Sequence, residues 1–311
     1  MERGIARQLR AIYGFNHCQV KKIDIGVMND NFLVKTEKGN FLFKRYRRKT
    51  PVEIRQDWRL LQYLHKLGFP VPVPQVTKNK KEIAIFLTGR GLLYKYIDGK
   101  IVNRLSIDQL EEVGKILGQM HRRVAVVSLP GLAKKQIWEL KELKNMMENI
   151  TTVEKTKMIF LSWLRREIDN FHFDRLPSGF THQDVKAENI VISKGKVKGL
   201  LDFDNSQVAT FLSDLTTTTI WSCFDRRGQL NIRRLVGLLR GYNVGRKLNK
   251  NEKKIFFIYL RFRLLREVFI CQYVSQKKKQ LVKRRARYFR NLYIHLAESE
   301  GKEISKIMEN I

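Results

Sequence analysis

The chain has 311 residues, of which 61 are lysine or arginine and 30 are aspartate or glutamate, which gives a formal net charge of +31 at pH 7. Because hydrophobic residues make up 43% of the chain and aromatic residues 10%, it can bury a sizeable core, and the composition excludes a disordered basic tail. Three isolated cysteines without CxxC spacing favour neither a disulfide framework nor a zinc site.

The N-terminal part of the sequence predicts a small antiparallel sheet. Residues 20–45 contain two short alternating runs that are separated by the turn-forming residues 37–40, a pattern typical of a hairpin. Two further apolar runs, at 83–87 and 92–97, are strand candidates. Apart from one inserted helix, we expect this region to be a sheet.

Most of the remaining sequence predicts helices, because its apolar residues recur every three or four positions. Residues 50–68 begin with a capping threonine and a proline and end at a glycine, which predicts the inserted helix. Apolar residues at spacings of three and four predict further helices over 107–121 and 134–171, and again after residue 213. A second β segment is expected over 181–203.

This order of elements predicts an α+β protein with two lobes. Residues 1–98 would form a β-rich, nucleotide-binding lobe, and residues 99–311 a mainly helical lobe with the catalytic loop and basic C-terminal helices. The lobes would be hinged at residues 96–99.

The most informative stretch contains two short strands, 190–193 and 197–201, joined at Lys194-Gly195-Lys196. If Ser193 pairs with Val197, the antiparallel register brings Asn189 opposite Leu201 and therefore beside Asp202. An amide oxygen and a carboxylate would then meet at one end of the hairpin. Both are hard oxygen ligands of the kind that Mg²⁺ prefers.

Asp184 lies on the loop before this hairpin, five positions before Asn189. From there it could accept a proton from a hydroxyl group or hold that group in line with a phosphorus atom. Kinases divide the work in this way between a loop aspartate, an asparagine and a second aspartate on magnesium. The pattern His-x-Asp-x-x-x-x-Asn followed by a hairpin and Asp-Phe-Asp therefore predicts phosphoryl transfer, although a single aspartate that caps a turn would be unremarkable.

The motifs His182-Gln183-Asp184 and Asp202-Phe203-Asp204 resemble the catalytic core of the aminoglycoside phosphotransferase and choline kinase family, which has a two-lobed, protein-kinase-like fold. In style they are most similar to the CotS-type spore coat proteins of endospore-forming bacteria. The resemblance extends from about Ile23 to Asp214, and it implies ATP and Mg²⁺ as cofactors.

Within this resemblance, Asp184 corresponds to the catalytic base, and Asn189 and Asp202 correspond to the magnesium ligands. His182 corresponds to the histidine that braces the loop, and a packed core histidine is the alternative. Lys186 resembles the protein-kinase lysine that approaches the transferred phosphate. The sequence lacks GxGxxG, Asp-Phe-Gly and Ala-Pro-Glu, so a small molecule or glycan is the favoured acceptor over a protein.

Lys44 ends a predicted strand and resembles the lysine that holds the α- and β-phosphates of ATP. Its acidic partner in the next helix departs from the family, because Asp57 stands where glutamate is usual. Glu53, one turn earlier, is the alternative partner, and a solvated helix face is the alternative for both.

Two further nucleotide contacts are implied. The loop from Gly26 to Asn31, with Asn29 within it, would cover the phosphates, although a lone glycine is a weak signal. Tyr96 belongs to the segment 94–97, whose backbone would contact adenine, unless this segment is simply a core or edge strand.

Cations are concentrated near the C-terminus, where eight of the fourteen residues from Lys277 to Arg290 are basic. An apolar stripe predicts an amphipathic helix with its charges outward. Such a segment would attract an anionic polymer or an anionic surface. The alternative is a charged face that only keeps the protein in solution. No zinc-finger spacing or base-reading motif predicts specific nucleic-acid binding.

We therefore expect an ATP- and Mg²⁺-dependent phosphotransferase that acts on a hydroxyl of a small molecule or glycan. The alternatives are a structural spore coat protein that retains the fold without catalysis, and a polyanion-binding module. The longest apolar runs stop far short of the ~18 residues of a membrane span, and residues 1–7 lack the apolar core of a secretory signal. A cytoplasmic protein, with a spore coat association, is expected.

Overall fold

The computed structural model describes residues 2–23, 29–87, 89–124, 162–163, 165–166, 176–271, 279–299 and 301–311. Contacts between residues divide the chain into two units. The first comprises Met1–Ile101 and Ile190–Asp204, and the second contains the rest of the described chain. The boundary at Ile101 is close to the predicted one at residue 98, but the hairpin that we assigned to the second lobe groups with the first unit.

The first unit is built on a five-stranded antiparallel sheet with the strand order β1-β2-β3-β5-β4. Its strands are β1 (Cys18–Ile23), β2 (Asp30–Thr36), β3 (Gly39–Tyr46), β4 (Ala84–Phe86) and β5 (Gly89–Lys95). The predicted hairpin and both later strand candidates are confirmed. Central β3 pairs with β2 and β5, so its side chains are fixed from both sides.

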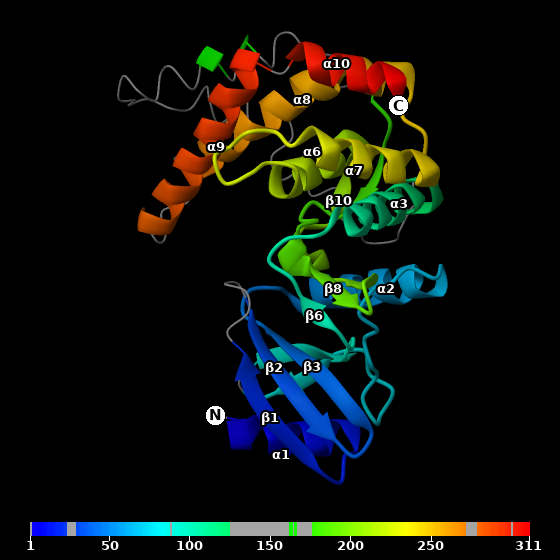
Figure 1. Cartoon of the computed structure of the whole chain (residues 1–311). Coiled ribbons are helices and arrows are strands. Elements are labelled where there is room, and N and C mark those ends of the chain that lie inside the picture. Colours follow the sequence, from blue (N-terminus) through cyan, green and yellow to red (C-terminus); the bar gives the residue numbers. More distant parts are fainter. Residues whose placement is uncertain are drawn as a thin grey trace. The chain divides into compact units, whose positions relative to one another are not determined.

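A helix that the sequence analysis missed, α1 (Glu2–Tyr13), precedes this sheet (Figure 1). Ile5, Leu9 and Tyr13 recur every fourth residue and are buried, which places them on one helix face. They form one core with Phe32 and Phe43 of the sheet. This regular spacing was a helix signal in the sequence that the sequence analysis overlooked.

The inserted helix α2 (Pro51–Lys66) is confirmed, and its start is fixed by a capping box. The Thr50 hydroxyl accepts a hydrogen bond from the Glu53 N–H at 3.3 Å. In return, the Glu53 carboxylate accepts one from the Thr50 N–H at 2.8 Å. Such reciprocal bonds satisfy donors that the first turn leaves open.

The hairpin of β8 (Ile190–Ser193) and β9 (Lys196–Leu200) continues onto β6 (Lys100–Ile101). Lys194 and Gly195 have φ values of 50° and 77°, as a two-residue type I′ turn requires. Ser193 therefore pairs with Lys196, and the predicted pairing with Val197 was wrong. A bulge then shifts the register by one residue, so that Ile190 pairs with Leu200. This is the pairing that our register implied.

The second unit is mainly helical (Figure 1). Its helices are α3 (Ile107–Val124), α6 (Phe211–Ser222), α7 (Ile232–Gly245), α8 (Lys250–Phe269), α9 (Lys279–Ser299) and α10 (Gly301–Asn310), and its strands β7 (Ser178–Thr181) and β10 (Gln207–Thr210) pair. The predicted helix over 107–121 is α3, whereas the one over 134–171 falls almost wholly outside the described residues. Among the helices that the structure describes, none could span a bilayer.

Helices α3 and α7 approach each other closely through glycines. A Cβ atom at Gly241 would collide with the carbonyl oxygen of Glu111, and one at Gly114 with that of Leu238. Both obstacles are backbone atoms, which cannot swing away as a long side chain can. These glycines therefore set the short distance between α3 and α7, the helices that carry the buried His121 and Tyr242.

We expect Gly241→Ala to destabilise the protein by about 1–3 kcal/mol, the usual cost of overpacking. The measurement is the urea-unfolding midpoint and slope. Gly4→Ala is the matched control, because it is also a helical glycine but a Cβ there has nothing within 4 Å. An equal effect of the two substitutions would contradict the packing argument.

Candidate active site

Lys44 of β3 lies against two carboxylates from the segment that follows β9. Its ammonium is 3.2 Å from Asp202 Oδ1 and 2.7 Å from Asp204 Oδ2. Burial alone would lower the pKa of Lys44, but the two carboxylates raise it above its ordinary value. Asp202 has a φ of 62°, a left-handed conformation that is unusual for a residue other than glycine. The backbone is thus bent where the carboxylate meets the lysine.

Asp204 is held on a second side as well. Lys49 Nζ lies 3.1 Å from its Oδ1, and Asn29 Nδ2 donates to its Oδ2 at 2.8 Å. Burial would raise the pKa of Asp204, but the ammonium groups of Lys44 and Lys49 hold it below its ordinary value. Asp204 therefore remains ionised, and Asn29, predicted for the phosphate-covering loop, contacts it directly. Gly26 lies outside the described residues.

Neither acid of α2 forms the predicted ion pair with Lys44 in the part of the chain that the structure describes. Asp57 pairs with Lys49 at 2.5 Å, and Glu53 belongs to the capping box. Burial raises the pKa of Asp57 despite the Lys49 ammonium. The expected pairing is replaced by an indirect one, because Lys49 from the connection between β3 and α2 lies between Asp57 and Asp204, which in turn contacts Lys44.

The first unit thus holds a line of alternating charges: Asp202, Lys44, Asp204, Lys49 and Asp57. Four of these side chains are at most 20% exposed: Lys44 (13%), Lys49 (15%), Asp57 (17%) and Asp204 (20%). The side chain of Asp202 is 42% exposed. Solvent therefore reaches the line mainly at Asp202. The sequence analysis did not identify Lys49, because it follows Arg47 and Arg48 in a run of cations. Its position directly before the capping residue Thr50 was the one feature that distinguished it from these neighbours.

The segment predicted to contact adenine is the end of β5. Tyr94 is buried and its hydroxyl shares a 2.9 Å hydrogen bond with that of Tyr46. The Tyr96 N–H donates to the Asn40 carbonyl oxygen at 3.1 Å. This donor is therefore engaged within the sheet, and adenine contact by Tyr96 stays a prediction.

In the second unit, Asp184 and Asn189 contact each other. Asn189 Nδ2 donates to Asp184 Oδ2 at 3.0 Å and to the Asp184 main-chain oxygen at 2.8 Å. Lys186 Nζ lies 3.1 Å from the other carboxylate oxygen. Because the Asn189 amide nitrogen has two acceptors, its Oδ1 points to the opposite side and is the atom that suits a cation. Three predicted residues are thus brought together.

His182 is buried and lies directly behind this loop. Its Nδ1 accepts a hydrogen bond from the Asp184 N–H at 3.2 Å. The next residue, Gln183, has a φ of 68°, so the loop turns sharply before Asp184. This arrangement agrees with the predicted bracing role. It agrees equally with a packed core histidine, because a buried ring that accepts a hydrogen bond from the loop does both.

Asp214 of α6 is a site residue that the sequence analysis gave no role in the site. Its carboxylate accepts hydrogen bonds from the backbone N–H groups of His182 and Gln183 at 2.6 and 2.5 Å. His121 Nε2 lies 3.0 Å from the same carboxylate. Burial would raise the pKa of Asp214, but its hydrogen bonds with His121 and His182 keep it below its ordinary value. The buried anion fixes the turn that presents Asp184.

His121 of α3 connects Asp214 with Tyr242 of α7. Its Nδ1 is 2.8 Å from the Tyr242 hydroxyl and its Nε2 contacts Asp214, so the neutral ring with hydrogen on Nε2 satisfies both contacts. Arg246 donates to the Tyr242 hydroxyl at 3.1 Å, which leaves the hydroxyl proton for His121. Burial lowers the pKa of His121 below its ordinary 6.5, although Asp214 opposes this.

This lowered pKa predicts that folding stability decreases in mild acid. The unfolded chain takes up the proton near the ordinary pKa of 6.5, before the folded protein does, so the stabilisation is complete above that pH and is lost below it. One such proton changes the free energy of unfolding by at most about 1.4 kcal/mol per pH unit. Urea unfolding at pH 7.5 and 5.5 should show a smaller difference in His121→Gln than in the wild type or in exposed His17→Gln. Equal differences in all three would contradict this assignment.

The basic segment from Lys277 to Arg290 is described only in part. From residue 283 onward, Ala286 and Phe289 of α9 are buried while the neighbouring cations are exposed. These exposed cations are Lys283, Arg284, Arg285 and Arg287. The amphipathic character is confirmed for this part, and binding of an anionic polymer stays a prediction.

A strand lysine facing two carboxylates and a loop with aspartate, lysine and asparagine define a kinase-type phosphotransferase. The chain belongs to the phosphotransferase enzyme family, whose model matches residues 19–248. The prediction of a kinase with a hydroxyl acceptor is confirmed by this membership and by the relatives. The likeness to CotS-type spore coat proteins stays a prediction.

Among characterised relatives, the chain is 28% identical over 245 residues to a homoserine kinase of Agrobacterium fabrum, covering 75% of this chain and 73% of that protein. It is 24% identical over 250 residues to a homoserine kinase of Zymomonas mobilis, covering 79% and 78%. These relatives are similar over most of their length.

Solved structures share the fold at low identity. A microcompartment-associated aminopropanol kinase has a TM-score of 0.74 at 14% identity, covering 97% of this chain and 99% of that one. An amicoumacin kinase in complex with AMP-PNP, Ca²⁺ and Ami has a TM-score of 0.72 at 17% identity, covering 98% of this chain and 93% of that one. The predicted kinase-like fold, with an antiparallel β-rich N-terminal region and a helical C-terminal region, is confirmed.

Proposed function

We propose that the protein transfers the γ-phosphate of ATP to a hydroxyl group of a small molecule, with Mg²⁺ as the metal. The observation that carries this proposal is the contact of Lys44 with Asp202 and Asp204. The sequence separates Lys44 and Asp202 by 158 positions, so only the fold unites them. A lysine and two carboxylates at one point supply the charges that a metal-bound triphosphate requires.

Lys44 would hold phosphate oxygens of ATP, and Asp202 and Asn189 are each proposed as a metal ligand. The donor set fits Mg²⁺, because carboxylate and amide oxygens are hard ligands and Asp202 is accessible to solvent. A bound Mg²⁺ would supply positive charge that offsets the negative charge developing on the phosphates during transfer. Asp204, already bonded to Lys44 and Lys49, would keep Lys44 in place and would be available as a further ligand.

Asp184 would accept the proton of the attacking hydroxyl. Its Oδ2 and main-chain oxygen are bonded to Asn189, and its Oδ1 is bonded to Lys186. A carboxylate held at both oxygens keeps one orientation, which favours in-line attack. Lys186 can leave Asp184 for the transferred phosphate as the proton moves onto the carboxylate.

The acceptor class is proposed from the relatives. Homoserine kinases and an aminopropanol kinase are named for small amino alcohols. We propose a small amino alcohol as the first acceptor to test and a glycan hydroxyl as the second. The net charge of +31 disfavours attraction of polycationic aminoglycosides over long range.

The test is transfer of labelled phosphate from Mg–ATP to a panel of amino alcohols, sugars and aminoglycosides. Wild type should phosphorylate one class, and Asp202→Asn should lose metal-dependent nucleotide binding. Glu309→Gln, an exposed carboxylate of α10, is the charge-matched control. Activity that is equal in wild type and Asp202→Asn would refute the proposal.

A spore coat association is proposed on the resemblance of His182-Gln183-Asp184 and Asp202-Phe203-Asp204 to CotS-type proteins. A cytoplasmic enzyme could be deposited on the spore after it has acted, or it could serve the coat as a structural component without turnover. Coat morphology in a deletion strain, compared with an Asp184→Asn strain, separates these roles. A purely structural role requires the Asp184→Asn strain to resemble the wild type.

A further inference from the structure

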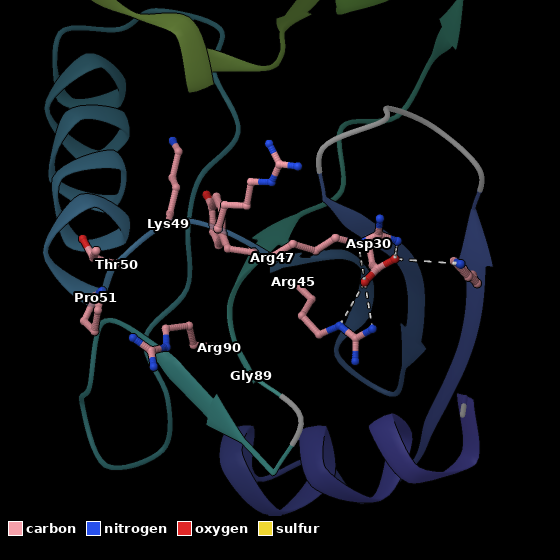
Figure 2. A pocket seen from close by; sticks show the side chains of 11 residues that line it. Asp30, Arg45, Arg47, Lys49, Thr50, Pro51, Gly89 and Arg90 are labelled. Carbon is pink, nitrogen blue, oxygen red and sulfur yellow. Dashed lines mark hydrogen bonds and ion pairs between the residues drawn. The ribbon is translucent and has the colours of Figure 1, made fainter. Parts of the chain in front are cut away.

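The first unit contains a pocket of about 650 Å³ whose wall is strongly cationic (Figure 2). It lies where the end of β3, the start of α2 and the start of β5 come together. Its basic lining residues are Lys22, Arg45, Arg47, Arg48, Lys49 and Arg90. Among the described lining residues, Asp30 is the one acid. No role in the proposed phosphoryl transfer accounts for this concentration of arginine.

The pocket lies beside the line of charges around Lys44 and shares one residue, Lys49, with it. Lys44, Asp202 and Asp204 do not line it. Neighbouring residues of a strand point to opposite faces, so Arg45 is directed away from Lys44. The Arg45 guanidinium lies 5.9 Å from the ring of Phe32, whose side chain belongs to the core that includes Ile5 and Leu9 of α1. Lys49 lines the wall, but its ammonium is directed to Asp57 and Asp204.

Among the lining residues that the structure describes, positive charge is only partly neutralised. Asp30 lies 2.7 Å from Arg45, 2.5 Å from Arg47 and 3.8 Å from Lys22. The hydrogen bond from Arg47 lowers the pKa of Asp30 to about 2, against the opposing effect of burial, so its single negative charge persists at any physiological pH. Lys49 is paired elsewhere, and the other five cations exceed this carboxylate by four charges.

We propose that this pocket binds a small molecule that carries two or more phosphate groups. A phosphate monoester has a charge of about −1.5 to −2 at pH 7, so two such groups match the excess and one does not. The guanidinium group offers paired donors to phosphate oxygens. The volume also falls within the range of roughly 300–1,000 Å³ for small-molecule sites. An inorganic polyphosphate and a bisphosphorylated metabolite share this chemistry.

Calorimetric titration with tripolyphosphate and with fructose 1,6-bisphosphate tests the proposal. Both titrations use the full chain with Mg–AMP-PNP at saturation, so that the nucleotide site is occupied. Arg48→Ala combined with Arg90→Ala should weaken binding about tenfold or more, as expected for lost hydrogen bonds to charged groups. Arg3→Ala combined with Arg7→Ala is the matched control, because it removes two exposed arginines of α1 outside the pocket.

Binding of either probe that depends on Arg48 and Arg90 supports the proposal, and the better probe identifies the source of the phosphates. Three results overturn it: neither probe binds the AMP-PNP-saturated wild type, the Arg48 and Arg90 double variant binds as tightly as the wild type, or both double variants lose affinity equally. Thermal unfolding of each variant confirms that it is folded. This inference goes beyond the proposed reaction, because a chain that transferred no phosphate would still show arginine-dependent binding.

Discussion

Replacement of Asp184 by asparagine is expected to lower phosphoryl transfer by about 10²–10⁴, the contribution of a positioned general base. Asparagine keeps the size of the side chain and can still hydrogen-bond to Asn189 through its oxygen. It cannot take up the hydroxyl proton, and it removes the negative charge that holds Lys186 at 3.1 Å. The rate should therefore fall with little effect on the affinity for Mg–ATP.

Single-turnover kinetics and nucleotide titration, performed on the same preparation, separate these two effects. If Asp184→Asn weakened nucleotide binding as strongly as it lowered the rate, a structural role of the loop would explain the loss better than catalysis. Glu309→Gln, which removes a carboxylate from the exposed side of α10, should behave as wild type. A change in both variants would point to net charge as the cause.

Helix α2 and the hairpin of β8 and β9 were predictable because residues that are adjacent in the sequence determine where they begin and turn. The capping box at Thr50 and Glu53 determines the start of α2. The turn at Lys194 and Gly195 determines the hairpin. The bulge between Val191 and Ile192 could not be predicted from the residue types. Helix α1 was overlooked although Ile5, Leu9 and Tyr13 recur at helical spacing. Its packing partner is a sheet formed by later residues, which no local rule identifies.

The candidate site was predictable where the chemistry is concentrated in one motif. Asp184, Lys186 and Asn189 lie within six residues of sequence and contact one another. By contrast, the contact of Asp214 with the loop crosses 31 to 32 positions, and that of Lys49 with Asp204 crosses 155. Such pairings depend on tertiary structure, and neither residue belongs to the motif.

Lys49→Met is expected to destabilise the first unit and to weaken ATP binding. Removal of this ammonium leaves Asp57 and Asp204 without a shared cation, at positions where the side chains are 17% and 20% exposed. Breaking a buried ion pair costs about 3–5 kcal/mol, and the residual exposure places this case at the lower end of that range. Asp204 would then lose one of the two ammonium groups it contacts and hold Lys44 more strongly. Lys44 would therefore meet the phosphates less readily.

The double variant Lys49→Met with Asp57→Asn gives the decisive comparison. It removes the unpaired carboxylate of Asp57, so it should be more stable than the sum of the single changes predicts, a coupling that a double-mutant cycle measures. Lys49→Arg should retain most of the stability, and Lys66→Met, at an exposed position of α2, should change little. Additive effects in the cycle would mean that Lys49 only lines the adjacent pocket. Strong coupling together with a raised KM for ATP would show that α2 is connected to Lys44 through Lys49 and Asp204.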